Sequence, residues 1–222
     1  MSMKEYLHIL KKVPLFSGLE ACELESLLGC LSAVKRSYKK NTFILRAGDE
    51  VRSLGIVLAG EIQICREDAS GSRIILASLG AGSLFAEAFV CSNTKILPVT
   101  VLSAAESSIL FVDYRRIITT CPAACPFHTR IIQNMLAILA DKNILLSRKI
   151  EHISQRTTRE KLLSYLQAVS AEKHSREFSI PFNRQELADY LCVDRSAMSA
   201  ALSKMQEEGL LSYSKNRFAL RD

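Results

Sequence analysis

The sequence lacks any apolar run long enough to cross a membrane. Apolar stretches such as residues 109–112 fall far short of the about 20 consecutive residues that a bilayer-spanning helix requires. The first residues, MSMKEY, also lack the continuous apolar stretch of a signal peptide. We therefore expect a protein that stays in the cytoplasm.

The sequence is also not poor in apolar side chains, as a disordered or low-complexity chain would be. Apolar residues make up 48% and charged residues 23% of the chain, which are the proportions of an ordinary globular protein. The length of 222 residues allows one large domain or two small ones.

Motifs that are typical of enzymes are missing. We find no paired carboxylates, no nucleophile beside a base, no metal-ligand spacing and no glycine-rich loop that could cradle a phosphate. The sequence therefore predicts a binding protein rather than an enzyme, with no metal site.

The C-terminal part of the chain has little excess of positive charge. Residues 1–150 carry 18 basic against 13 acidic residues, whereas residues 151–222 carry 11 against 10. The net charge of +6 permits an anionic partner. DNA binding by the C-terminal part must therefore be argued from the placement of individual side chains.

Short β-type segments dominate the first half of the chain. Residues 5–31 show helical spacing of leucines, but from about residue 38 β-rich segments alternate with turn signals such as Gly48-Asp49 and Gly60-Glu61. The expected strands cover residues 43–45, 55–58, 62–65, 73–79, 99–104 and 107–112. Such spacing is typical of an antiparallel barrel or roll.

A long helix is expected after Pro126, with a heptad stripe on one face. The stripe comprises Ile132, Leu136, Leu139, Asn143, Leu146, Ile150 and Ile153. Asn143 occupies an a position, where paired asparagines fix the register of a parallel two-stranded coil. The stripe predicts a dimer seam, and a second row could pack back on the β domain (Ile131, Met135, Ile138, Leu145). The alternative is a helix that packs only on its own domain, with Asn143 at the rim.

The last third of the chain is helical again. Thr157 with Glu160, and Asn183 with Glu186, both fit the capping box that opens a helix. We expect a helix from the first box and a short strand over residues 178–182. Two further helices are expected over residues 184–191 and 195–207, followed by a hairpin of residues 211–213 and 217–220.

Two short helices joined by a three-residue turn are typical of a helix-turn-helix. Their apolar residues form one face, and the small Ala188 lets the helices cross closely. This face comprises Leu187, Ala188, Leu191, Val193, Met198, Leu202 and Met205. Asp194 can cap the second helix, and the hairpin after it predicts a wing. Cys192 is a misfit, because glycine usually supplies the positive φ at this turn position.

The exposed start of the second helix carries polar side chains that can reach base edges in the major groove. Cations on the hairpin are placed for phosphates. The candidate DNA-binding residues are Arg184, Gln185, Arg195, Ser196, Ser199, Ala200, Lys204, Lys215 and Arg217. The alternative is a helical-hairpin interaction module, which the small local charge favours.

Five segments carry a resemblance to a known family. They read FILRAGD at residues 43–49, IVLAGE at 56–61, GSLFAE at 82–87, NRQELADYL at 183–191 and VDRS at 193–196. From about residue 14 to residue 220, the chain resembles a bacterial Crp/Fnr-family transcription regulator, the family of the cyclic-AMP receptor protein.

The resemblance implies an α+β fold of three parts. An N-terminal antiparallel β-roll, a jelly roll of the cyclic-nucleotide-binding type, would form the effector domain over residues 1–125. A dimerisation helix would cover residues 126–153, and a winged helix-turn-helix DNA-binding domain residues 154–222.

The resemblance also implies a homodimer on double-stranded, pseudo-palindromic operator DNA, with RNA polymerase as a further partner. An effector bound in the roll would re-orient the reading heads. The alternative is a regulatory subunit of the cyclic-nucleotide-binding type that does not act on DNA. The winged helix argues against this alternative.

The chain departs from cyclic-AMP-binding members at their phosphate site. Those members place an Arg-Ser pair about ten residues after the position of Glu87, where this chain has Leu97 and Pro98. A buried phosphodiester would be uncompensated there, which costs several kcal/mol. We therefore expect an apolar pocket that does not take cyclic AMP. The identity of the effector stays open between a small organic molecule, haem and an iron–sulfur cluster. The candidate pocket residues are Leu84, Phe85, Glu87, Leu97, Pro98 and Val99.

The seven cysteines leave redox chemistry open. Cys121 and Cys125 could form a regulatory disulfide or ligate a metal. The oxygen-sensing branch of the family holds an iron–sulfur cluster on closely spaced N-terminal cysteines, but here Cys22 and Cys30 are spaced more widely. Haem also occurs in the family, with His128 and His152 as candidates by residue type alone. The alternative for the cysteines is that they are reduced thiols without a redox or metal-binding role. The alternative for the two histidines is that they are ordinary core or solvent-facing residues.

The second helix of the helix-turn-helix, over residues 195–207, is the reading helix that would enter the major groove, and it departs from the family as well. Many members carry an arginine at the position of Ala200, where it contacts a guanine. Alanine cannot make that bidentate pair, which is worth about 1–3 kcal/mol of discrimination. The sequence therefore predicts a changed operator core.

Overall fold

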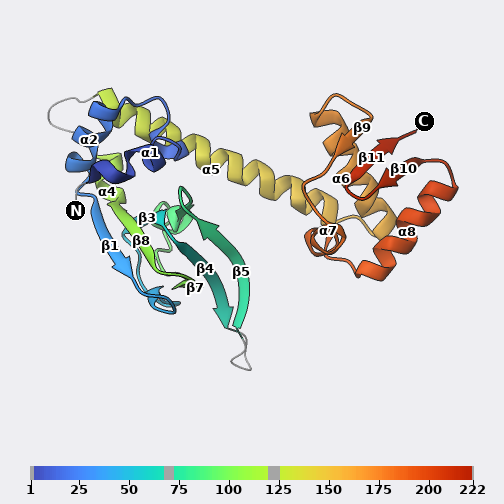
Figure 1. The fold of residues 1–222 in the computed structure, drawn as a ribbon, viewed down its shortest axis with the longest axis horizontal. Helices are drawn as coiled ribbons and strands as arrows, with labels where there is room; N and C mark the ends of the chain where they lie inside the picture. Colours follow the sequence, from blue (N-terminus) through green and yellow to red (C-terminus); the bar gives the residue numbers. More distant parts are fainter. Residues whose placement is uncertain (1–2, 68–72, 120–125, 222) are drawn as a thin grey trace. The chain divides into compact units, whose positions relative to one another are not determined.

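The computed structural model describes residues 3–67, 73–119 and 126–221 (Figure 1). It divides into two compact units, residues 1–140 and residues 141–222, and the boundary falls within helix α5 (Pro126–Ile153). The three-part division expected at residues 125 and 153 stays a prediction, because α5 contributes to both units.

Two four-stranded antiparallel sheets form the first unit, in the strand orders β1-β8-β3-β6 and β2-β7-β4-β5. The strands are β1 (Val34–Tyr38), β2 (Phe43–Leu45), β3 (Ser53–Ala59), β4 (Glu61–Glu67), β5 (Arg73–Gly80), β6 (Leu84–Phe85), β7 (Thr100–Ser103) and β8 (Ser107–Asp113). The predicted antiparallel roll is confirmed. Strands β1 and β6 were not predicted, because β1 is a polar edge strand and β6 has only two residues.

Strand β3 supplies much of the buried core of the roll, including Leu54, Ile56 and Leu58. Its Gly55 lets the ring of Phe85 lie directly against the strand backbone, because a Cβ at Gly55 would overlap that ring. Phe85 in turn meets Phe111 edge to face, with ring centroids 6.3 Å apart. Close packing therefore fixes how β6 and β8 meet β3.

Short helices pack on the same core (Figure 1). They are the 3₁₀ helices η1 (Met3–Tyr6) and η2 (Pro14–Phe16), and the α-helices α1 (Leu7–Leu10), α2 (Ala21–Cys30), α3 (Glu87–Val90) and α4 (Tyr114–Ile118). The sequence did not predict α3 and α4, because they are too short to show a helical period. None of the helices in the described ranges is long and apolar enough to cross a membrane.

Helix α5 begins in this core. Ile131 and Met135 are buried there, and Asn134 Nδ2 donates hydrogen bonds to the carbonyl oxygens of Leu15 (2.9 Å) and Ser17 (3.0 Å). The predicted second row is thus confirmed for Ile131 and Met135. It is wrong for Leu145, which lies past the unit boundary and is 61% exposed.

The second unit combines helices with a small sheet of strand order β10-β11-β9. Its elements after α5 are α6 (Thr158–Glu172), β9 (Glu177–Ser179), α7 (Arg184–Leu191), α8 (Arg195–Glu207), β10 (Leu211–Ser214) and β11 (Arg217–Leu220). Both predicted capping boxes are present, at Thr157 and at Asn183. Strand β9 ends at Ser179 rather than at residue 182, because Pro181 has no N–H to extend the ladder.

Candidate nucleic-acid interface

Helices α7 and α8 form the predicted helix-turn-helix, with the predicted bounds. Cys192 ends α7 in the left-handed conformation, with a φ of 52°, and the N–H of Val193 donates to the carbonyl oxygen of Ala188 (3.0 Å). The turn therefore has the positive φ that glycine usually supplies, although the residue is a cysteine.

The N-terminus of α8 is held by Asp194. Its carboxylate accepts hydrogen bonds from the backbone N–H groups of Ser196 (2.8 Å) and Ala197 (3.0 Å). These hydrogen bonds to the charged form hold the pKa of Asp194 below its usual value, with the Ser196 hydroxyl as the largest cause. The cap fixes where the reading helix begins.

A shared core fixes the crossing of the two helices. Leu187, Ala188 and Leu191 of α7 are fully buried. They pack in one cluster with Met198, Leu202 and Met205 of α8, also fully buried. The predicted apolar face is confirmed for these six residues, whereas Val193 is only partly buried. Rigid packing of this kind orients a reading helix for a groove.

The predicted DNA-reading side chains lie on the exposed side of α8. Arg195, Ser196, Ser199, Ala200 and Lys204 are all exposed. The hydroxyl of Ser196 donates to the Asp194 carboxylate, and that of Ser199 donates to the carbonyl oxygen of Arg195 (2.9 Å). In this arrangement both hydroxyls have lone pairs left for an incoming donor.

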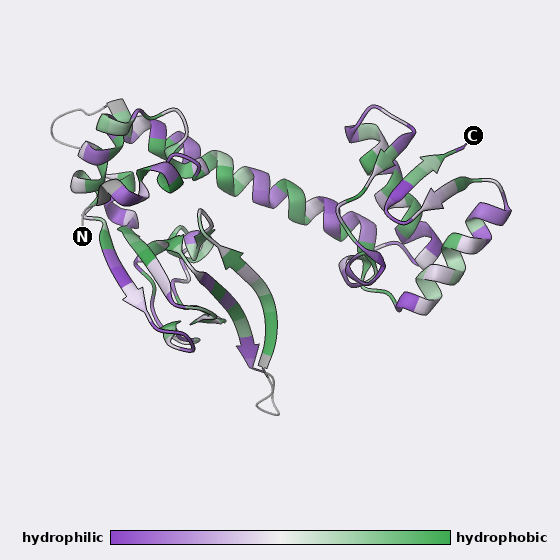
Figure 2. Ribbon diagram, viewed as in Figure 1, coloured by the Kyte–Doolittle hydropathy of each residue, from purple (hydrophilic) through white to green (hydrophobic). Residues whose placement is uncertain are grey.

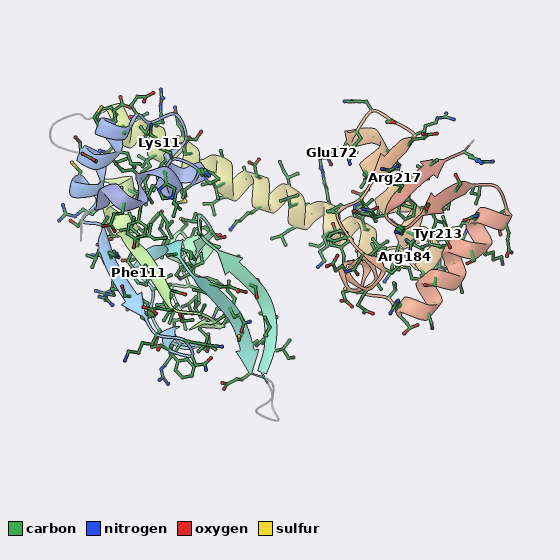
Figure 3. All side chains as sticks on the ribbon, in the orientation of Figure 1. Lys11, Phe111, Glu172, Arg184, Tyr213 and Arg217 are labelled. Carbon is green, nitrogen blue, oxygen red and sulfur yellow. The ribbon has the colours of Figure 1, made fainter. Side chains whose placement is uncertain are left out.

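Arg184, at the start of α7, has a contact that the sequence did not predict. Its guanidinium lies 4.6 Å from the ring centroid of Tyr213 and 5.2 Å from that of Phe218. Figure 3 labels Arg184 and Tyr213, which lie close together. Partial burial lowers the pKa of Arg184, but a guanidinium stays protonated in proteins. Arg184 therefore braces α7 against the hairpin, and its predicted phosphate contact stays a prediction.

The hairpin of β10 and β11 presents the other predicted cations. Lys215 and Arg217 are exposed, and Lys215 has a φ of 52°. Asn216 ties the turn to the rest of the unit, since its Nδ2 donates to the carbonyl oxygen of Ile180 (3.2 Å) and its own carbonyl accepts from the N–H of Ile180 (2.9 Å). Gln185 hydrogen-bonds Asp189 on α7 (2.9 Å) and is exposed.

Asn183→Ala should lower the free energy of unfolding of the second unit by about 1 kcal/mol. The Asn183 side chain accepts from the N–H of Glu186 (3.0 Å), and the Glu186 carboxylate accepts from the N–H of Asn183 (2.7 Å). Alanine removes the first of these bonds, whereas Asn183→Asp keeps a cap. Urea denaturation of the three proteins measures the difference, and equal losses in both variants would contradict the capping role.

The candidate effector residues of the roll range from core to surface. Phe85, Glu87 and Leu97 are buried, Leu84 and Val99 are half-buried, and Pro98 is exposed. Phe85 and Leu97 belong to hydrophobic clusters. An effector at this place would therefore have to fit beside packed side chains, and the pocket stays a prediction.

The described cysteines and histidines supply no ligand set for a metal. Cys121 and Cys125 lie outside the described residues, and within the described ranges no three His, Cys, Asp or Glu side chains are grouped to hold an ion. Cys22 and Cys30 are exposed free thiols. The described residues therefore do not fit an iron–sulfur cluster.

Both candidate histidines are buried. His152 Nδ1 lies 2.8 Å from Ser164 Oγ, its ring packs edge to face on Tyr165, and burial lowers its pKa. His128 Nδ1 has no hydrogen-bond partner among the described residues. Nothing in the described part of the chain tests haem ligation, so it stays a prediction.

The second unit is a winged helix-turn-helix. It consists of α8 with its Asp194 cap, the packed helix α7 and the hairpin of β10 and β11 with its exposed cations, and the β-roll precedes it in the chain. This combination defines a DNA-binding transcription regulator with a cyclic-nucleotide-binding-like domain. Residues 35–121 match the family model of the cyclic nucleotide-binding domain, and residues 160–222 match that of the Crp-like helix-turn-helix domain. The chain belongs to the Crp/Fnr family of bacterial transcription regulators.

Its relatives are distant. The CRP-like protein Clp of Xanthomonas campestris pv. campestris is 23% identical, over 80% of this chain and 79% of that protein. The cAMP-activated global transcriptional regulator CRP of Haemophilus influenzae is 20% identical, over 78% of each chain. The solved structure of the c-di-GMP-responsive regulator CLP of Xanthomonas campestris has the same fold, with a TM-score of 0.53 at 21% identity, over 91% of this chain and 100% of that chain.

Proposed function

We propose that the protein binds a pseudo-palindromic DNA operator as a homodimer and that an effector in the roll controls this binding. The observation that carries the proposal is the exposed row on the capped helix α8, from Arg195 to Lys204, beside the exposed cations of the wing. In the dimer the two α8 helices enter major grooves about one helical turn apart, roughly 34 Å.

In this proposal the dimer seam is the heptad stripe of α5. Hydrophobic (green) and hydrophilic (purple) residues alternate along the ribbon of this helix (Figure 2). Leu136, Leu146 and Ile150 are 63%, 61% and 59% exposed, although large aliphatic side chains at helical spacing usually face a partner. Ile132, Leu139 and Ile153 are half-buried, and Asn143 is exposed. A second copy of α5 would cover the exposed side chains and pair the two Asn143 amides.

The effector of this protein is not cyclic AMP. Relatives are described as cAMP-activated and as c-di-GMP-responsive, and the roll of this chain has the same domain type. Here, however, the place of the phosphate-binding pair holds Leu97, which is buried in the hydrophobic core, and Pro98, which has no N–H. A small organic effector remains the proposal for the roll, and RNA polymerase remains the proposed further partner.

The operator core differs from that of members with an arginine at the position of Ala200. A methyl group cannot pair with guanine, but it can contact the C5 methyl group of thymine. Arg195, five residues earlier on α8, keeps the capacity for a bidentate pair with guanine. If selection from random DNA recovers the operator core sequence that family members with this arginine bind, this part of the proposal is contradicted.

The proposed function is tested by selecting sites from random double-stranded DNA and measuring affinity by fluorescence anisotropy. We expect affinity to fall steeply with salt, because phosphate contacts release counterions. Arg195→Ala should weaken binding by about 10- to 100-fold. The matched control is Arg156→Ala, which removes the same charge from an exposed position outside the interface.

Failure to select any site, or binding that is insensitive to salt, would overturn the DNA-binding proposal. Equal losses in Arg195→Ala and Arg156→Ala would overturn the assignment of α8 as the reading helix.

A further inference from the structure

The second unit contains a cavity that the proposed function does not use. Its volume is 320 Å³, and it lies between the end of α5, helix α6 and the segment that leads from β9 into α7. Ligand cavities span about 300–1,000 Å³, so this cavity suits a small molecule of one or two rings.

Three aromatic rings form one wall of the cavity. The ring centroids of Phe182 and Tyr190 are 5.0 Å apart, and the ring of Tyr165 lies 5.4 Å from Tyr190 and 6.1 Å from Phe182. Aliphatic side chains of α6, including Val169, also line the cavity. Packed aromatic rings of this kind favour a flat, apolar ligand that can stack on them or meet them edge-on.

Tyr165 adds a hydrogen-bond donor to this wall. The residue is only 6% exposed, and its hydroxyl makes no hydrogen bond within the described ranges. Its oxygen is not among the buried atoms that lack a partner, so the hydroxyl is accessible to a molecule in the cavity that Tyr165 lines. Burial raises the pKa of Tyr165 to about 12, so the phenol is neutral at pH 7 and can donate. A ligand acceptor in the cavity would satisfy it.

Cations line the same cavity. Arg148 forms an ion pair with Glu172 (3.2 Å), and Lys173 donates to the carbonyl oxygen of Ser179 (2.6 Å). Lys149 does not line the cavity, but its Nζ lies 5.2 Å from the ring centroid of the lining residue Tyr190. Glu172 is the one carboxylate among the lining residues, so the cationic side chains around the cavity outnumber the anionic ones.

We propose that this cavity binds a small aromatic carboxylate. The ring occupies the aromatic wall, and the carboxylate takes hydrogen bonds from Arg148, Lys173 and the Tyr165 hydroxyl. A carboxylate fits the forked guanidinium of Arg148 better than it fits any neutral donor. The ligand competes with Glu172 for that guanidinium.

Residues of both α5 and α7 line the cavity, since Arg148 belongs to α5 and Tyr190 belongs to α7. A bound carboxylate therefore contacts both the helix with the dimer seam and the helix that supports the reading head. We expect the bound ligand to change the affinity of the protein for its operator. The size of this change equals the extent to which the ligand binds one arrangement of α5 and α7 more tightly than another. This coupling rests on the proposed function, whereas ligand binding does not.

The test uses the full-length protein and salicylate as the probe, with calorimetry as the readout. We expect saturable binding with a Kd below about 1 mM. Phenol lacks the carboxylate and cyclohexanecarboxylate lacks the aromatic ring, so each should bind at least about tenfold more weakly. Equal affinity of either compound would overturn the proposed ligand class.

Two variants locate the site. Ala168→Trp fills the cavity, and Ala171→Trp is the matched control on an exposed position of α6 that does not line it. Ala168→Trp should abolish salicylate binding. Arg148 is exposed, so Arg148→Gln leaves the core intact, and it should weaken salicylate binding about tenfold. Ala171→Trp should bind as the wild type does.

Unchanged binding in both Ala168→Trp and Arg148→Gln, or no saturable binding to the wild type, would overturn the site. Salicylate binding without any change in operator affinity would overturn only the coupling. Because binding is measured without DNA, a failure of the DNA-binding proposal would leave this result unaffected.

Discussion

Replacing Leu146 by aspartate is expected to leave the protein folded but monomeric, with operator affinity lowered about 100-fold or more. Leu146 is 61% exposed on α5, so its loss removes little of the core. In the proposed seam two copies of this side chain meet at a d position, where two carboxylates would be buried and would repel each other. A monomer binds only one half-site, so it loses the increase in affinity that comes from binding two linked half-sites at once.

Sedimentation at micromolar concentration and fluorescence anisotropy on the selected operator measure the two effects. The control is Ile144→Asp, which makes the same change at a side chain that is 51% exposed. Ile144 and Leu146 point about 160° apart around the helix. Ile144→Asp should therefore remain a dimer. A dimeric Leu146→Asp protein, or monomers from both variants, would contradict the heptad seam.

Gly60→Ala is expected to destabilise the roll by about 3 kcal/mol or more. Gly60 joins β3 to β4 with a φ of 84°, a conformation that residues with a Cβ rarely adopt. A Cβ there would also overlap the carbonyl oxygen of Glu106 and the side chain of Ser107. Ser107 cannot easily move, because its hydroxyl hydrogen-bonds the N–H of Glu61 (3.1 Å).

Thermal unfolding followed by circular dichroism measures this loss. Gly29→Ala is the matched control, because a Cβ at Gly29 meets no atom within 4 Å and the residue lies within helix α2. Alanine should stabilise that helix by about 0.5–1 kcal/mol. A Gly60→Ala protein as stable as the wild type would show that the β3–β4 connection can relax.

Local signals account for the accuracy of prediction in the second unit. Asn183 and Glu186 satisfy each other's backbone N–H groups within one turn, and the Asp194 side chain accepts from the N–H groups of Ser196 and Ala197 at the start of α8. Such contacts join residues two or three positions apart, so the sequence alone predicts where the helices begin. The short elements of the roll, such as β6 and α3, carry no such signal and were missed.

The sequence by itself determined the class of this protein: the antiparallel roll, the long helix, the helix-turn-helix with its wing, and the side chains on the exposed start of α8. Those features follow from periodicity, capping and turn chemistry, which act between neighbours along the chain. Only the tertiary structure decided that Arg184 stacks on Tyr213. It also decided that Leu145 leaves the core of the roll, and that Tyr165 and Tyr190 meet beside Arg148. These contacts join residues of different elements, so they depend on how whole helices and strands pack, and no local pattern in the sequence specifies them.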